Sequence, residues 1–227
     1  MKTSWADSQM GRVAGVIVVG GALIAAPELP AQGLTGSGMA YHVQHRVLYS
    51  GAVYEQTGTF VGAEGSAWVG PLRVGVSGWM GTLSGANDSI NPDRKVRATA
   101  VTVLLEPWPM IALGGEVEAK RFEADAGVNA WRLIGATGRA TLGLGVPGLA
   151  GTAQVTWFPS ASVIGGEKIS LAFRGTIGAS YSAPRGPLTV SLGYRFERFD
   201  FAAVGTTPAR LDQFRGIVVG AGLRLGR

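Results

Sequence analysis

The feature that most constrains this chain is an alternation of polar and apolar residues that recurs in ten segments after residue 32. The stretch RATLGLGVPGLAGTAQVTWFP, residues 139–159, shows it on both sides of a VPG turn. An alternation with a period of two residues is typical of β-strands whose two faces meet different surroundings. No stretch after residue 32 keeps the 3.6-residue period of an amphipathic helix. The sequence therefore predicts an all-β fold.

The spacing of the ten segments predicts how the strands connect. Each segment is as long as a tilted membrane-spanning strand of roughly 9–11 residues, or a little longer. Short connections that contain proline, such as GVPG and APRGP, alternate along the chain with longer polar connections. Tight turns on one side and longer loops on the other are typical of a transmembrane barrel. The expected strands are residues 38–49, 58–69, 72–83, 95–105, 110–122, 131–144, 149–158, 168–182, 188–199 and 213–225.

The composition indicates which solvent surrounds the apolar face of these strands. Charged residues make up only 15% of the chain, and it contains 36 glycines among 227 residues. In the stretch quoted above and the three residues before it, Ala136, Leu142 and Val155 share one face, whereas Thr137 and Arg139 share the other. An apolar outer face and a polar inner face suit a closed barrel in lipid, where every backbone group must be paired. The alternative is a secreted β-sandwich, in which the apolar face would form the core.

The N-terminal segment predicts export. Val13 to Pro27 is apolar but shorter than the roughly 20 residues that a membrane-spanning helix needs. It follows Arg12, so we interpret residues 1–31 as a cleaved signal peptide, with Met10 as a possible true start. The alternative is an N-terminal anchor helix. Residues 32–227 then form a single domain, which lacks cysteine and therefore disulfides.

The signal segment, the ten alternating segments, the short turns and the longer loops together resemble the small outer-membrane β-barrel proteins of bacteria. The resemblance implies a transmembrane antiparallel up-and-down barrel of about ten strands. Its short turns would lie in the periplasm and its longer loops outside the cell. It also implies location in the bacterial outer membrane and insertion by the barrel-assembly machinery.

Aromatic residues fall near the ends of the expected strands. Trp68, Trp108 and Tyr181 lie at turn ends. Aromatic girdles at both membrane interfaces are expected of such a barrel. The aromatic residues at the loop ends are Tyr49, Phe60, Trp79, Phe122, Trp131, Phe158, Phe199 and Phe214. The alternative for inward-facing aromatic residues such as Trp79 is that they fill the lumen.

Charged and amide side chains on the polar faces predict a salt-bridged network in the lumen. Counting from the turns places Glu118 opposite Arg97 and Glu197 opposite Arg174. The same counting places Glu64 near Gln44 and Arg46, and Glu116 near Arg139. Charges in a constricted lumen must be paired, because a lone buried charge is costly. The predicted network is Gln44, Arg46, Glu64, Arg97, Glu116, Glu118, Arg139, Arg174, Arg195 and Glu197.

The formal net charge of +5 requires a partner or a surface. Nucleic acid is not expected, because no compact basic face with interleaved aromatic residues appears. Many basic residues instead fall at the loop ends of strands, where an outer leaflet presents phosphates of lipopolysaccharide or phospholipid. The predicted lipid-phosphate contacts are Arg94, Lys95, Lys120, Arg121, Arg132, Lys168, Arg198, Arg210 and Arg215.

The sequence offers little for catalysis or metal binding. His42 and His45 lie three residues apart on one expected strand, so they point to opposite faces, His42 toward the lumen. Glu116 and Glu118 share a face, but Arg97 and Arg139 are expected to keep both ionised. We therefore expect no catalytic residues, metal or cofactor, and interpret the chain as no enzyme.

Three functions remain open. The first is a structural, envelope-maintenance barrel with a salt-bridged lumen. The second is a narrow channel or carrier for small solutes, since ten strands enclose more space than the eight that side chains just fill. The third is a lipid-modifying outer-membrane enzyme.

Overall fold

The computed structural model describes residues 33–85, 93–124, 127–164 and 167–226, so the predicted signal peptide at residues 1–31 lies outside the described residues. The described residues form ten β-strands. Among them, no helix is long and apolar enough to cross a membrane. The strands are β1 (Gly33–Tyr49), β2 (Ala52–Val69), β3 (Leu72–Gly85), β4 (Arg94–Trp108), β5 (Ile111–Ala124), β6 (Gly127–Gly143), β7 (Leu149–Ile164), β8 (Ile169–Ser182), β9 (Leu188–Phe201) and β10 (Arg210–Gly226).

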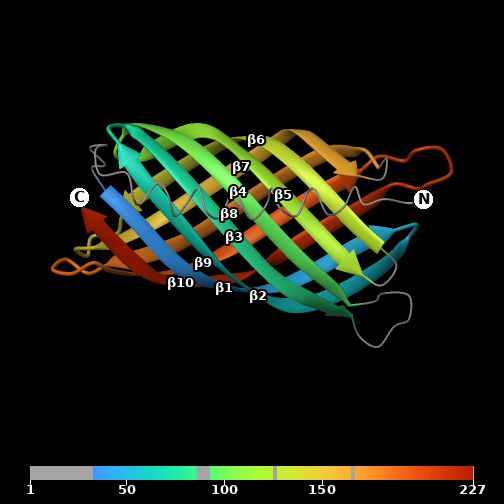
Figure 1. The fold of residues 1–227 in the computed structure, drawn as a ribbon, viewed down its shortest axis with the longest axis horizontal. Helices are drawn as coiled ribbons and strands as arrows, with labels where there is room; N and C mark the ends of the chain where they lie inside the picture. Colours follow the sequence, from blue (N-terminus) through green and yellow to red (C-terminus); the bar gives the residue numbers. More distant parts are fainter. Residues whose placement is uncertain (1–32, 86–92, 125–126, 165–166, 227) are drawn as a thin grey trace, which may run out of the picture. The chain divides into compact units, whose positions relative to one another are not determined.

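The strands close into an antiparallel up-and-down barrel (Figure 1). Each strand pairs with its neighbours in sequence, and β1 pairs with both β2 and β10. Closure gives the backbone of every strand a partner on each side, which removes the exposed edges that an open sheet would present to lipid. The predicted fold class is confirmed.

The register around the barrel sets the tilt of its strands. Following paired residues from Gly33 through each strand in turn leads back to β1 at His45, a stagger of twelve residues between positions 33 and 45. Stagger and strand number together fix the inclination of strands to the barrel axis. Figure 1 shows the resulting strong tilt.

The strands run further toward the loop side than the sequence predicts. Residues 50–57 are expected as a loop, but only Ser50 and Gly51 separate β1 from β2. Both have positive φ, 50° and 81°, as in the two-residue turns that match the twist of a hairpin. At the same end, β7 continues to Ile164 rather than stopping at residue 158.

The two faces of the strands exchange polarity part of the way along the barrel. On β1 the outward residues are small or apolar up to Ala40, and polar at Gln44 and Arg46. The inward residues change in the opposite sense, from Ser37 to the buried Val43. We call the part before this change the turn-side half and the part after it the loop-side half.

The loop-side half has a packed apolar core inside the barrel. Several aromatic residues predicted for the loop-end girdle form this core instead, so that prediction is wrong for them. Two outward aromatic side chains that do lie at the change of polarity are Phe173 and Phe196, with ring centroids 5.6 Å apart. The predicted girdle residues now found in the core are Phe60, Trp79, Phe122, Trp131, Phe158, Phe199 and Phe214.

Candidate functional site

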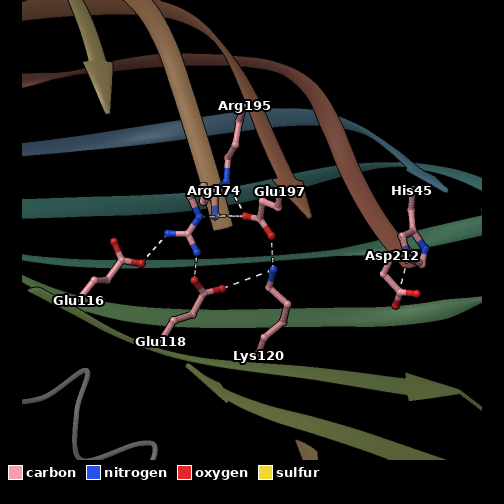
Figure 2. Close-up of polar contacts among 8 residues, drawn as sticks. All are labelled: His45, Glu116, Glu118, Lys120, Arg174, Arg195, Glu197 and Asp212. Carbon is pink, nitrogen blue, oxygen red and sulfur yellow. Dashed lines mark hydrogen bonds and ion pairs between the residues drawn. The ribbon is translucent and has the colours of Figure 1, made fainter. Parts of the chain in front are cut away.

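A cluster of six charged side chains crosses the lumen where the two halves of the barrel meet (Figure 2). Arg174 of β8 lies among three carboxylates, with its Nε 3.1 Å from Glu197 Oε1 and with ion pairs to Glu116 and Glu118. Arg195 Nε donates to Glu197 Oε1 over 2.7 Å. β5, β8 and β9 therefore meet through their side chains across the barrel.

Lys120 of β5 completes the cluster. Its ammonium group pairs with Glu197 and lies 3.5 Å from Glu118 Oε1. It is enclosed on the loop side by four aromatic rings, whose π faces attract a cation. Distances from Lys120 Nζ to the ring centroids are 4.8 Å for Phe199, 4.9 Å for Phe214, 5.3 Å for Trp79 and 5.9 Å for Trp131.

The cluster contains three carboxylates and three cations, so it carries no formal charge. All six side chains are largely removed from solvent. Because a buried charge without a partner is costly, the group is stable only when complete. The aromatic core adjoins the cluster on its loop side, so the loop-side half of the lumen is filled.

Seven of the predicted lumen residues do face the lumen, whereas Gln44, Arg46 and Arg97 lie on the outer face. Arg97 alternates with the buried Val96 and Ala98, and Gln44 alternates in the same way on β1. His42, also expected inside, shares this outer face with Gln44. These predictions fail because the rule of polar residues inward reverses in the loop-side half. The residues placed correctly are Glu64, Glu116, Glu118, Arg139, Arg174, Arg195 and Glu197.

The predicted pairing of Arg174 with Glu197 is confirmed by the register of β8 and β9. The pairing of Glu118 with Arg97 is wrong, because the register of β4 and β5 places Ala100 opposite Glu118. Counting from the EPWP turn misplaces the strand by an odd number of residues, and this exchanges its faces.

Two further predicted pairings also fail. Glu64 lies opposite Ser37 rather than near Gln44 or Arg46, since the hairpin turns at residues 50–51. Glu116 pairs with Arg174 rather than Arg139. In both cases the partner depends on a turn length or a cross-barrel contact that the sequence does not display.

The predicted lipid-phosphate residues divide between the two surfaces. Arg94, Lys120 and Arg210 point inward, which corrects their assignment. The Cζ atom of Arg210 lies 3.9 Å from the ring centroid of Phe201, and its Nε lies 3.0 Å from Asp212 Oδ1. Lys168 lies in the connection between β7 and β8. Those on the outer face are Lys95, Arg121, Arg132, Arg198 and Arg215.

The turn-side half of the lumen is hollow. A cavity of about 950 Å³ extends from turn residues such as Gly70 and Pro109 to Glu116 and Arg195 of the charge cluster. Serine, threonine and glycine make up much of its wall. The inward-facing positions of the loop-side half carry large aromatic residues instead. The size of the inward side chains therefore decides which half of the lumen is open.

A buried histidine–carboxylate pair near the loop end was not predicted. His45 Nε2 lies 3.9 Å from Asp212 Oδ2, and the imidazole stacks on Phe214 with centroids 4.1 Å apart. His45 is 1% exposed, so the pair stands inside the core rather than at a surface that a substrate reaches. The pairing of β1 with β10 brings these two residues together, and no local signal in the sequence indicates it. Among the described residues, no group of three candidate ligands could hold a metal ion.

This barrel architecture is similar to that of known structures, although the similarity is in fold rather than in sequence. No protein-family model matches the sequence, and neither does any curated protein. Among solved structures, the outer membrane protease OmpT from Escherichia coli is similar, with a TM-score of 0.51 and 9% identity over 86% of this chain and 97% of OmpT. The translocator domain of the autotransporter NalP from Neisseria meningitidis matches 99% of this chain and all of that one, with a TM-score of 0.46 and 14% identity. Neisserial surface protein A covers 85% of this chain and 97% of its own, at 12% identity and a TM-score of 0.38.

The comparison with OmpT corrects one prediction. The sequence was interpreted as that of no enzyme, but this barrel architecture also occurs in a protease. The fold therefore gives no ground for excluding catalysis.

Proposed function

We propose that this outer-membrane β-barrel protein is a structural component of the cell envelope with a closed, salt-bridged lumen. The observation that carries the proposal is the filled loop-side half. A complete charge cluster lies beneath an aromatic core in which Trp131 and Phe214 are at most 2% exposed. An ion entering from the turn side would have to separate buried ion pairs and then cross packed aromatic side chains, both of which are costly.

Conductance in planar bilayers tests this proposal. The protein is folded in detergent, checked by the heat-dependent shift of its band on a gel, and inserted into the bilayer beside a general diffusion porin as positive control. We expect a heat-modifiable band and no conductance steps. Steady conductance that changes in the Glu197→Gln variant would overturn the closed-lumen proposal.

A narrow channel or carrier for small solutes is the second candidate, and the turn-side cavity favours it. The cavity admits solutes as far as Arg195 and Glu116. Passage beyond that level would need the charge cluster and the core to open together. The conductance measurement decides between the two candidates.

We also propose that the outer surface of β4, β5 and β6 binds lipid phosphates. Arg97 and Arg121 lie directly opposite each other, and Arg132 lies diagonally across from Arg121. Directly opposed like charges destabilise a sheet. An anionic headgroup in the outer leaflet would offset that repulsion and bind the guanidinium groups. Lys95 adjoins them on β4, and we call these four residues the basic cluster. Glu123 lies opposite Lys95 and pairs with Arg121 over 2.8 Å, so the four cations share one carboxylate and keep an excess of positive charge.

Lipid retention tests the basic cluster. The protein is extracted with detergent from membranes containing lipopolysaccharide, and the phosphorylated lipid that remains bound is measured by mass spectrometry. Replacing all four cluster residues by glutamine should remove that lipid. Arg46→Gln with Arg198→Gln is the control, because these outer cations lie on β1 and β9, outside the basic cluster, and each has its own carboxylate partner, Glu55 and Asp200. Equal retention by the four-residue variant and the wild type would contradict the proposal.

We further propose that residues 1–31 direct export and are then removed, before the barrel-assembly machinery inserts the barrel. The mass of the protein isolated from outer membranes tests this. We expect a chain that begins near residue 32, whereas a retained segment would indicate the anchor-helix alternative.

A further inference from the structure

We infer that the turn-side cavity is a binding site for a small, hydroxyl-rich anion, of which a sugar phosphate is the representative. This goes beyond the proposed structural function, and it stands whether or not the barrel conducts ions. A cavity of about 950 Å³ is within the range of small-molecule sites, roughly 300–1,000 Å³. Because it ends at the charge cluster, a ligand enters and leaves by the turn side.

The charges that face this cavity favour an anion. Among the described residues that line it, arginine is the only cationic type and glutamate the only anionic type. The charge cluster contributes Arg174, Arg195 and Glu116 to the wall and is neutral as a whole, so the excess of positive charge comes from the remaining three arginines against two glutamates. The lining charges are Arg73, Arg139, Arg174, Arg195 and Arg224 against Glu64, Glu106 and Glu116.

Two of these arginines are available to a ligand. Arg73 already has partners: its Nη1 lies 3.8 Å from Glu106 Oε1, its Nε donates to Ser66 Oγ over 3.2 Å, and it stacks over Trp68. Arg139 and Arg224 form no ion pair with any carboxylate in the described part of the chain. Both line the same cavity as Arg73 and lie close enough to repel its guanidinium group. A bound phosphate or carboxylate would offset this repulsion and can accept two hydrogen bonds from one guanidinium.

The rest of the wall suits a ligand with hydroxyl groups. Its polar side chains are mostly hydroxyls, which both donate and accept hydrogen bonds, together with the amide of Gln154. Such groups can replace the water around a sugar without a charged partner for each oxygen. The hydroxyl residues that line the cavity include Thr102, Thr141, Thr152, Thr176, Ser180 and Ser191.

The glycines along the cavity wall are of two kinds: some are needed for close packing of the strands, and others leave open space. At Gly178, an added Cβ would lie 2.6 Å from the carbonyl oxygen of Leu192, so glycine is needed there for the strands to fit. At Gly75 the nearest atom to an added Cβ is 3.7 Å away, and at Gly143 nothing lies within 4 Å. A Cβ therefore fits at those two positions, and a larger side chain there would project into the cavity.

Binding of glucose 6-phosphate to the folded protein in detergent tests the inference. Isothermal titration calorimetry at low salt compares the wild type with the variant that carries Arg139→Gln and Arg224→Gln. The control carries Arg46→Gln and Arg198→Gln, which remove the same charge from the outer face. We expect the cavity variant to weaken binding at least about tenfold, corresponding to the loss of charge-assisted hydrogen bonds. The control should bind as the wild type does.

Three further measurements make the inference falsifiable. Gly75→Leu should weaken binding by occupying part of the cavity while leaving the heat-modifiable band intact. Glucose should bind at least tenfold more weakly than glucose 6-phosphate, and inorganic phosphate should also bind more weakly. Equal binding of inorganic phosphate would overturn the hydroxyl-rich part, and equal binding of glucose would overturn the anionic part. No binding of glucose 6-phosphate at millimolar concentration, or equal weakening in the outer-face control, would overturn the site.

Discussion

The two halves of this barrel distribute polar and apolar side chains in opposite ways between the outer face and the lumen of the same ten strands. In the turn-side half, exposed outer residues such as Val155 and Leu192 are apolar, and the lumen is polar and hollow. In the loop-side half, the outer face carries Arg97 and Arg121, and the lumen is a packed aromatic core. The first arrangement suits lipid outside, and the second is that of a water-soluble protein. The comparison indicates that the bilayer surrounds the turn-side half, whereas the loop-side half stands in the headgroup region and the water beyond it.

The largest effect that tests this comparison is expected in the loop-side core. Trp131 is 2% exposed and packs against Phe122, Phe199 and Phe201. Trp131→Ala should lower the free energy of unfolding by about 4 kcal/mol, through lost burial and the cavity left behind. Equilibrium urea unfolding in lipid vesicles measures it.

Trp157→Ala is the matched control, because that tryptophan is 54% exposed on the outer face. We expect it to cost less than half as much as Trp131→Ala. Equal losses would mean that the loop-side half has no core of its own.

The next effect concerns the boundary between the halves. Lys120→Met keeps the length of the side chain but leaves Glu118 and Glu197 with one cation fewer. We expect a loss of about 3 kcal/mol in unfolding free energy, since the cluster keeps three buried carboxylates but only two cations. The same urea titration measures it.

Neutralising a carboxylate as well distinguishes charge balance from packing. The double variant Lys120→Met with Glu118→Gln restores the neutrality of the cluster. It should recover part of the loss, so that the two changes are not additive. A double variant less stable than either single one would contradict the view of the cluster as a charge-balanced unit.

A smaller effect locates the bilayer directly. Val155→Arg places a charge on the outer face of the turn-side half and should cost about 2–4 kcal/mol if that position lies near the middle of the bilayer. Ser84→Arg places the same charge on the outer face of the loop-side half, opposite Thr57. It should cost about 1 kcal/mol or less. Similar costs at both positions would show that the bilayer does not distinguish the halves as proposed.

The sequence by itself determined the strands and their order. Period-two alternation and proline-marked turns placed all ten strands. Their turn-side ends lie within one residue of the predicted ones except in β1, which begins at residue 33 rather than 38, and β4, which ends at residue 108 rather than 105. Closure followed, because unpaired strand edges are not tolerated in lipid. The inward orientation of four charged side chains was also predictable, because they lie at the change of polarity or on its turn side. These residues are Glu116, Glu118, Arg174 and Glu197.

Only the tertiary structure decided which face of each strand is inside in the loop-side half. Alternation shows that a strand has two faces but not which solvent each one meets, so Arg97 was assigned inward. The outward assignment of Lys120 rested on its place near a loop end and disagreed with the alternation, which puts it on the same face as Glu118. Lys120 faces inward because it shares its side of β5 with Glu118, and the partners that stabilise it there, Glu197 and Phe199, lie on β9. Contacts across the lumen join residues far apart in the chain, and they leave no periodic trace in the sequence of either strand.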